Sequence, residues 1–187
     1  MNSEKYFFFW KHRIANWTIT KFIAKGVTYN CGEQYMMHQK ALFFNDKETA
    51  VKIMATKVPR EQKDLGRQVK GFNESAWDKV KFQLVKEGLK ARYEQDPELK
   101  QFLIERKHLQ FVEASPFDRI WGIGYDANNA IANIDNWGEN LLGKVITELA
   151  KEFAAPKVCE RTEHTYKYFT KPEDHWIARC TKCGDLI

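Results

Sequence analysis

The first thirty residues carry aromatic and β-branched side chains in short runs, a pattern typical of strands. One run covers residues 6–10, and two shorter runs at 17–20 and 27–29 stand on either side of Gly26. Because glycine between such runs favours a turn, we expect short strands or extended segments in this part of the chain.

Apolar residues then recur every three or four positions, which predicts helices for most of the chain. Asn30 and Glu33 have the spacing of a capping box, so the first helix should begin at Asn30 and run to about Phe44. One face of this helix would carry Glu33, Met37 and Lys40, with Lys40 two turns beyond Glu33.

Later helices are indicated by N-cap residues or proline at their starts and glycine at their ends. Gly66 would end the third helix, Asn73 would cap a long fourth one, and Asp96-Pro97 would open the fifth. A short strand is expected at 109–112, and the Gly-, Pro- and Asp-rich stretch 114–132 should be mainly loop. The expected helices cover residues 46–56, 59–65, 74–93, a segment from 96 onward, and 138–153.

These elements predict an α+β domain, mostly helical with a small β component, over residues 1–155. A separate tail would cover residues 156–187, with Pro156 at the boundary. An apolar content of 43% over 187 residues is enough to give the larger part a hydrophobic core.

Charge and hydropathy narrow the class of protein. No stretch approaches the roughly 18–20 apolar residues of a membrane span. The N-terminal run lacks the small-residue cleavage site of a signal peptide, so we expect a cytoplasmic protein with no membrane partner. The net charge of +5 favours anionic partners only slightly. An ordinary solvated surface would show the same even spread of lysines.

Three of the four cysteines crowd the tail, where their spacing indicates a metal site. Two apolar-polar strands are expected on either side of a turn at 171–174, and a segment this small needs bound metal to stabilise it. A redox CxxC pair, or reduced cysteines without a ligand role, are the alternatives. We expect a structural zinc ribbon with a closed site formed by Cys159, Cys180, Cys183 and a histidine, His164 or His175, of which His164 is better placed beside Cys159.

Several motifs in the front domain occur in an order and spacing that resembles the NADAR superfamily. The resemblance covers about residues 6–153 and leaves out the tail. Two departures are Ala15-Asn16-Trp17, where the family usually has Ser-Asn-Phe, and Gln34, where many relatives carry histidine. The motifs are Glu33-Gln34-Tyr35-Met36-Met37 with Lys40-Ala41, Lys63 to Gly66-Arg67, Trp77, Glu113-Ala114-Ser115-Pro116-Phe117-Asp118-Arg119-Ile120-Trp121-Gly122-Ile123-Gly124, and Trp137-Gly138-Glu139-Asn140-Leu141-Leu142-Gly143.

Members of that superfamily include an N-glycosidase acting on early riboflavin-pathway intermediates and enzymes that remove ADP-ribose from guanine in nucleic acid. The resemblance therefore implies hydrolysis of a ribosyl C1′–N bond without a catalytic metal. Such hydrolysis passes through an oxocarbenium-like state and needs a carboxylate near C1′, for which Glu33 and Asp118 are the candidate pair. From the residues alone, Glu33 could instead be a capping-box glutamate and Asp118 a turn former after Pro116.

The candidate substrate-binding residues also have structural alternatives. Arg67 could hold a phosphate or a ribose hydroxyl or be a surface arginine, and Trp77 and Trp121 could stack on a base or belong to the core. We leave Glu113 out of the catalytic pair because we expect it to pair with a neighbouring base, and we interpret Cys31 as a small buried residue. The full binding set is Asn16, Lys40, Gly66, Arg67, Trp77, Trp121, Gly122, Gly124 and Asn140.

Three functions are compatible with these patterns. The first is an N-glycosidase acting on an ADP-ribosylated base, a free ADP-ribosyl compound or a phosphoribosylated pathway intermediate. The second is a non-catalytic module that binds ADP-ribose or nucleic acid and uses the zinc ribbon as a grip. The third is an adaptor whose front domain only supports protein contacts. Intact Glu33, Lys40, Arg67, Asp118 and Trp121 favour the enzyme. Its expected partner is a ribosyl or ADP-ribosyl small molecule, with nucleic acid as a further candidate.

Overall fold

A computed structural model describes residues 3–155, 166–170 and 176–180 of the chain. The chain divides into two compact units, Met1–Phe153 and Ala154–Ile187, which are described separately. None of the helices in the described part of the chain is long and apolar enough to cross a membrane.

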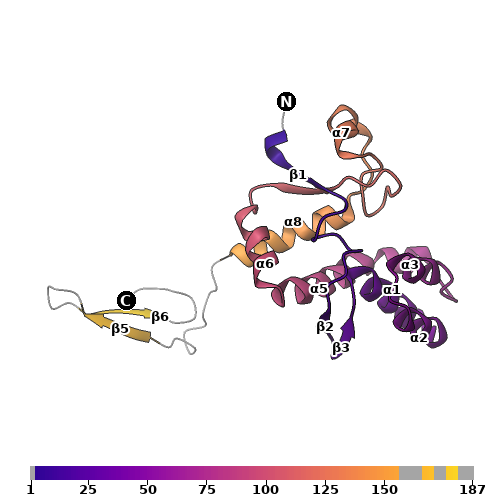
Figure 1. The fold of residues 1–187 in the computed structure, drawn as a ribbon, viewed down its shortest axis with the longest axis horizontal. Coiled ribbons are helices and arrows are strands. Elements are labelled where there is room, and N and C mark those ends of the chain that lie inside the picture. The colour runs from indigo at the N-terminus through magenta and orange to yellow at the C-terminus, as the bar shows by residue number, and fades with distance from the viewer. Residues whose placement is uncertain (1–2, 156–165, 171–175, 181–187) are drawn as a thin grey trace. The chain divides into compact units, whose positions relative to one another are not determined.

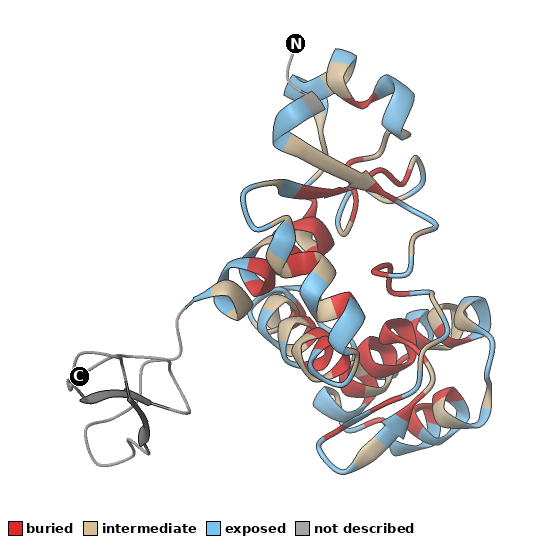
Figure 2. Ribbon diagram, turned by 60° about the vertical axis from the view of Figure 1, so that its left-hand side comes forward, coloured by how far each residue is buried: buried red, intermediate tan, exposed pale blue. Residues whose placement is uncertain are grey.

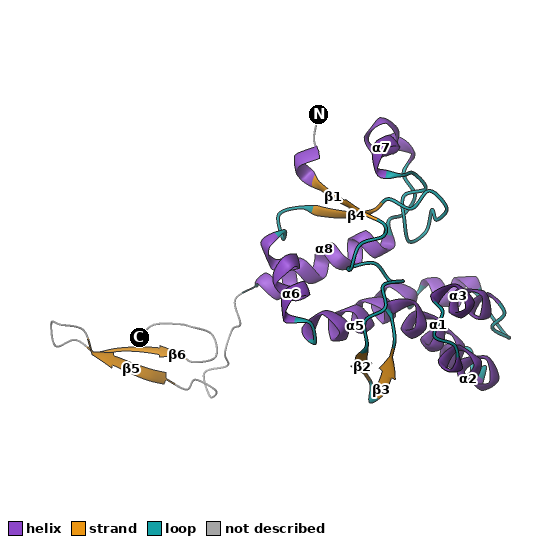
Figure 3. Ribbon diagram, in the orientation of Figure 1, coloured by secondary structure: helices purple, strands orange, loops and turns teal. Residues whose placement is uncertain are grey.

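Helices form most of the larger unit (Figures 1 and 3). Helix α1 contacts α2, α3 and α5, and these four helices lie together on one side of the unit. Short helices and 3-10 turns complete the set. The bounds are η1 Ser3–Lys5, α1 Gly32–Phe43, α2 Lys47–Ala55, α3 Pro59–Arg67, α4 Glu74–Asp78, α5 Lys81–Glu94, α6 Pro97–Glu105, α7 Ala127–Ala130, η2 Ile131–Asn136 and α8 Leu141–Ala154.

Two small sheets accompany these helices. Strand β1 (Tyr6–Phe9) pairs in parallel with β4 (Gln110–Glu113), and Phe7 lies opposite Phe111. The backbone N–H of Phe111 donates to Thr147 Oγ1 of α8 at 2.9 Å, which ties this sheet to the helical layer. The hairpin of β2 (Phe22–Ala24) and β3 (Val27–Tyr29) packs on α5 and turns through Lys25 and Gly26, both at positive φ.

The core lies where these layers meet, along the inner faces of the helices (Figure 2). Helix α8 contributes an apolar stripe at the spacing of one helix face: Leu142, Val145, Ile146, Leu149 and Ala150. The stripe packs in one cluster with Met36 of α1, Leu89 of α5, Leu103 of α6 and Phe111 of β4. This cluster therefore joins the β1–β4 sheet to the helices and fixes the elements that carry the candidate site residues.

Most predicted element types are confirmed, and the helix starts at Asn73 and Asp96 are correct. Asn73 Oδ1 accepts the N–H of Ala76 at 2.8 Å, and Asp96 Oδ1 accepts that of Leu99 at 2.9 Å. Three predictions about helices are wrong. The first helix is capped by Cys31, not Asn30; Gly66 lies inside α3; and the long helix at 74–93 is broken, because Val80 leaves helical geometry with φ −121°.

One prediction about the remaining segments needs correction. Residues 17–20 form no strand, since the hairpin begins only at Phe22. The stretch 114–132 is mainly loop, as predicted, and its helical end begins where Asp126 accepts backbone N–H groups of Asn128 and Asn129 and so starts α7.

The second unit holds the two strands predicted for the tail. Strand β5 (Tyr166–Thr170) pairs antiparallel with β6 (Trp176–Cys180), with Tyr166 opposite Cys180. Cys180 is the last residue of β6, whereas Cys159, His164, His175 and Cys183 lie outside the described residues. The zinc site therefore stays a prediction from the sequence.

Candidate active site

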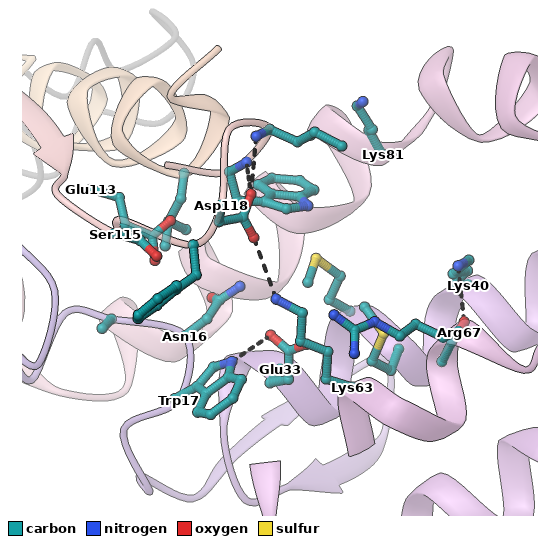
Figure 4. Close-up of a pocket in the computed structure, with 18 of the residues that line it drawn as sticks. Asn16, Trp17, Glu33, Lys40, Lys63, Arg67, Lys81, Glu113, Ser115 and Asp118 are labelled. Carbon is teal, nitrogen blue, oxygen red and sulfur yellow. Dashed lines mark hydrogen bonds and ion pairs between the residues drawn. The ribbon is translucent and has the colours of Figure 1, made fainter. Parts of the chain in front are cut away.

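A cavity of about 940 Å³ lies in the larger unit, within the usual size range of ligand sites (Figure 4). Its walls come mainly from four parts of the chain that are distant in sequence: the segment before β2, helix α1, the stretch from α3 to the start of α5, and the end of β4 with the loop after it. Leu142 of α8 also lines the cavity. Of the predicted site residues, the cavity is lined by Asn16, Glu33, Lys40, Gly66, Arg67, Trp77, Asp118 and Trp121.

Glu33 occupies the first turn of α1 and is 2% exposed. Its Oε2 accepts the indole N–H of Trp17 at 3.1 Å, while Oε1 has no hydrogen-bond partner among the described residues. Burial raises the pKa of Glu33 to about 7, although the charge of Lys63 and the Trp17 hydrogen bond act in the opposite direction. Glu33 is therefore a buried carboxyl group at the cavity wall, close to the point of half-ionisation at neutral pH.

The capping-box interpretation of Glu33 is wrong, because the neighbouring Gln34 satisfies the backbone instead. Gln34 Oε1 accepts the N–H of Asn30 at 2.8 Å, and its Nε2 donates to the carbonyls of Ile53 and Thr56. Gln34 does not line the cavity. Gln34 therefore links α1 to the end of α2 and takes no part in the cavity wall.

Asp118 lies in the loop after β4 and both forms a turn and faces the cavity. Its Oδ1 accepts the backbone N–H groups of Ile120 at 3.0 Å and Trp121 at 2.8 Å. Its Oδ2 accepts from Lys63 Nζ at 3.3 Å, and Lys63 also lies 5.8 Å from the centre of the Trp17 ring. Asp118 is therefore a turn former that also lines the cavity, and its catalytic role stays a prediction.

Glu113, at the end of β4, also lines the cavity. It forms no ion pair within the described residues, contrary to the expected pairing with a base, and its buried Oε2 has no hydrogen-bond partner there. Burial, with the negative charges of Asp118 and Glu33, raises the pKa of Glu113 to about 8 against the opposing charge of Lys63. Sequence reasoning missed this group. The available signal was a glutamate at the end of an apolar strand, directly before a glycine-rich loop.

Cations and aromatic rings complete the cavity wall. Lys40 Nζ donates to the carbonyl of Gly66 at 2.9 Å and lies 4.0 Å from the centre of the Phe72 ring. Arg67 bonds Asp64 at 3.0 Å but remains largely exposed, and it extends from α3 on the same side as Lys63 (Figure 4). Trp77 is 7% exposed and belongs to the core as well as to the cavity wall, while its stacking on a base stays a prediction.

Three predicted binding residues do not line the cavity, and they support the Glu113 segment. Asn140 Oδ1 accepts the N–H of Glu113 at 2.9 Å, and its Nδ2 donates to the carbonyl of Phe111 at 3.0 Å. A Cβ on Gly122 would approach the Glu113 carbonyl oxygen to 2.9 Å, and Gly124 adopts φ +79°. These three residues therefore shape the loop after β4 from behind the cavity.

Gly66 and Asn16 line the cavity and also permit close packing. A Cβ on Gly66 would lie 2.0 Å from Met37 Sδ, so α3 needs glycine here to approach α1. Gly32 lets Asn16 pack closely in the same way, since a Cβ on Gly32 would lie 2.5 Å from Asn16 Oδ1. The Asn16 carbonyl accepts the N–H of Glu33 at 3.0 Å, which holds the two residues together.

Fold and cavity together define an α+β domain whose cavity combines buried carboxyl groups, lysine and aromatic walls. The chain matches the NADAR domain over residues 2–154 and belongs to the NADAR family. It is 45% identical over 126 residues to N-glycosidase R617 of Acanthamoeba polyphaga mimivirus, covering 66% of this chain and 74% of that protein. It is 32% identical over 132 residues to Protein irg-1 of Caenorhabditis elegans, covering 68% and 62%.

The family's fold is also found in a solved structure. N-glycosidase YbiA of Escherichia coli is 28% identical over 132 residues, covering 71% of this chain and 75% of that protein. The NMR structure of the E. coli protein YbiA matches with a TM-score of 0.67 and 24% identity over 88% of this chain and 92% of that chain. This likeness shows that the two proteins share a fold.

Proposed function

We propose that the chain is an N-glycosidase that hydrolyses a ribosyl C1′–N bond. The observation that carries the proposal is the placement of Glu33 in the cavity: a buried carboxyl group with one free oxygen, beside Trp17 and Lys63. R617 and YbiA, which are called N-glycosidases, support the same reaction class. Buried acidic groups in a cavity wall suit a reaction whose transition state carries positive charge at C1′.

In this proposal the Glu33 carboxylate takes the proton of the attacking water and stabilises the oxocarbenium-like ribosyl group. The Trp17 N–H holds one oxygen of Glu33, and the other, buried oxygen has no hydrogen-bond partner among the described residues. Asp118 and Lys63 form a fixed ion pair in the same cavity, and the aromatic rings of Trp77 and Trp121 provide surfaces on which the base could stack.

The substrate we propose is an ADP-ribosylated compound or base, for example ADP-ribosylated guanine, or a riboflavin-pathway intermediate. A cavity of about 940 Å³ has room for more than one ring system. Lys40, Arg60, Lys63 and Arg67 give it cations that suit phosphate groups. Both features fit a phosphorylated ribosyl compound better than a bare nucleoside.

The experiment incubates the protein with ADP-ribosylated DNA, NAD-derived compounds and riboflavin-pathway intermediates, and identifies released ribosyl product and free base by mass spectrometry. Release of both from at least one compound is the expected result. Binding of an ADP-ribosyl compound without release from any member of the panel would contradict the proposal and favour the non-catalytic binding module.

A further inference from the structure

The Glu113 side chain is placed by a rigid backbone frame. Its N–H donates to Asn140 Oδ1 at 2.9 Å, and its carbonyl accepts the N–H of Ile123 at 3.0 Å. The strand pairing with Phe9 holds the residue from the other side. The carboxyl group therefore enters the cavity from a fixed strand end, opposite the helices that carry Glu33 and Lys63 (Figure 4).

The groups that face Glu113 leave its carboxyl group without a counter-ion. They are Glu33 from α1, Lys63 from α3, Asp118 from the following loop and Tyr93 from α5. Lys63, the single cation among them, already pairs with Asp118 at 3.3 Å. Burial and two carboxyl neighbours disfavour a further negative charge, and the pKa of about 8 for Glu113 is the result.

We propose that Glu113 is the general acid of the reaction, the group that donates a proton to the departing base. This inference rests on the proposed N-glycosidase function. As the C1′–N bond breaks, its electron pair stays on the base nitrogen, which takes the proton of Glu113. Water oxygen bonds to C1′ and gives its proton to the Glu33 carboxylate. Solvent exchange then restores both groups, so the net reaction adds one water and yields the ribosyl hydroxyl compound and the protonated base.

The division of roles between the two glutamates follows from their surroundings. Glu33 accepts the Trp17 N–H, which favours its ionised form, whereas the charge of Lys63 acts in the same direction on both glutamates. Glu113 has no donor on its Oε2 among the described residues. A carboxyl group whose ionised form accepts a hydrogen bond and a second carboxyl group without a donor can serve as base and acid in one site.

The test compares Glu113→Gln and Glu33→Gln on two substrates with the ribosyl part that the wild-type protein accepts. One is an N-ribosylpyridinium, whose base leaves without needing a proton, and the other carries a neutral base that needs one. Glu113→Gln should lower kcat on the neutral base by about 10²–10⁴-fold and leave the pyridinium within a few-fold. Glu33→Gln should lower kcat on both substrates, and Glu94→Gln, an exposed control, should lower it on neither. Equal losses on both substrates with Glu113→Gln would overturn the proposal.

The pH profile gives a second readout. Activity that needs protonated Glu113 is lost as pH rises through about 8, and this basic limb should disappear in Glu113→Gln. An unchanged basic limb would contradict the assignment. Infrared spectra of the unliganded protein at neutral pH should show a protonated-carboxyl band that Glu113→Gln reduces. If the wild-type protein turns substrate over but Glu113→Gln does not reduce the infrared band, only the assignment of Glu113 as general acid is overturned. A wild-type protein that cleaves no C1′–N substrate would overturn the proposed function itself.

Discussion

Burial of the Glu33 carboxyl group makes the protein's stability depend on pH. Because its pKa is raised in the folded state, the contribution of Glu33 to stability is fully present below about 4.5 and is lost as pH rises through about 7. At about 1.4 kcal/mol per pH unit, the free energy of unfolding should fall by about 3 kcal/mol over that window. Glu33→Gln should remove this loss and unfold at higher urea than the wild type at alkaline pH. If the urea midpoints of Glu33→Gln and the wild type differ by the same amount at acidic and at alkaline pH, the expectation is contradicted. Glu94→Gln serves as the exposed control.

Asp118 offers a test of charge with little change in shape. Asp118→Asn keeps Oδ1 as acceptor for the Ile120 and Trp121 N–H groups but loses the ion pair with Lys63. Turnover should fall at least about tenfold, while binding of an ADP-ribose analogue changes less. Asp126→Asn is the matched control, because Asp126 accepts two backbone N–H groups in a turn that does not line the cavity. Equal rates for Asp118→Asn and the wild type would reduce Asp118 to a turn former.

Residue types and motifs predicted Glu33, Lys40, Arg67 and Asp118 among the charged residues that line the cavity, but not their ionisation. Glu33 and Asp118 could be selected because a glycosidase needs carboxylates. The free carboxyl of Glu113 could not, since its lack of a counter-ion depends on Lys63 being paired with Asp118. The motifs also did not show that Asn140 supports β4, whereas other motif residues line the cavity.

Helix α5 fixes the segment that brings Asn16 and Trp17 to the site. The fully buried Arg92 donates to the carbonyls of Ala15 at 2.9 Å and Arg13 at 2.7 Å. Arg92→Lys cannot reproduce this fork of donors. It should lower the free energy of unfolding by about 1–3 kcal/mol and reduce turnover, measured by urea unfolding and steady-state kinetics. Arg106→Lys, at a more exposed carbonyl contact, is the control. Unchanged turnover in a destabilised Arg92→Lys would limit Arg92 to a structural role.

Element boundaries were predictable where local hydrogen bonds set them and not where packing did. Asn73 and Asp96 cap helices through their own side chains, within three residues of the bonded N–H groups. Gly66 was wrongly predicted as a helix end. Glycine is needed at this position because Met37 of another helix packs closely against it. The break at Val80 has no such local signal either.

For the whole molecule, the mostly helical α+β class was predictable, but the parallel pairing of β1 with β4 was not. These strands lie about a hundred residues apart, and no local pattern specifies which distant strand will pair. That pairing places the segment after β1 beside the loop after β4, and both line the cavity. The site therefore depends on a contact that a single sequence does not reveal.

The tail carries a prediction about the whole chain. We expect one zinc per chain, bound through Cys159, Cys180, Cys183 and a histidine, because so small a segment needs metal to stabilise it. Metal analysis of protein purified without chelator under reducing conditions tests this, and absence of zinc would contradict it. A chain ending at residue 155 should keep its turnover of a small ribosyl substrate. Loss of that turnover in a folded truncated chain would show that the tail contributes to the active site.

The most direct test of the account compares wild type and Glu33→Gln on the substrate that the panel identifies. Free base and ribosyl product are quantified together by mass spectrometry, and the substrate affinity of both proteins is measured. We expect equal molar release of base and ribosyl product by the wild type, and no measurable release by a folded Glu33→Gln that still binds substrate. Release by Glu33→Gln within a few-fold of the wild-type rate would contradict it.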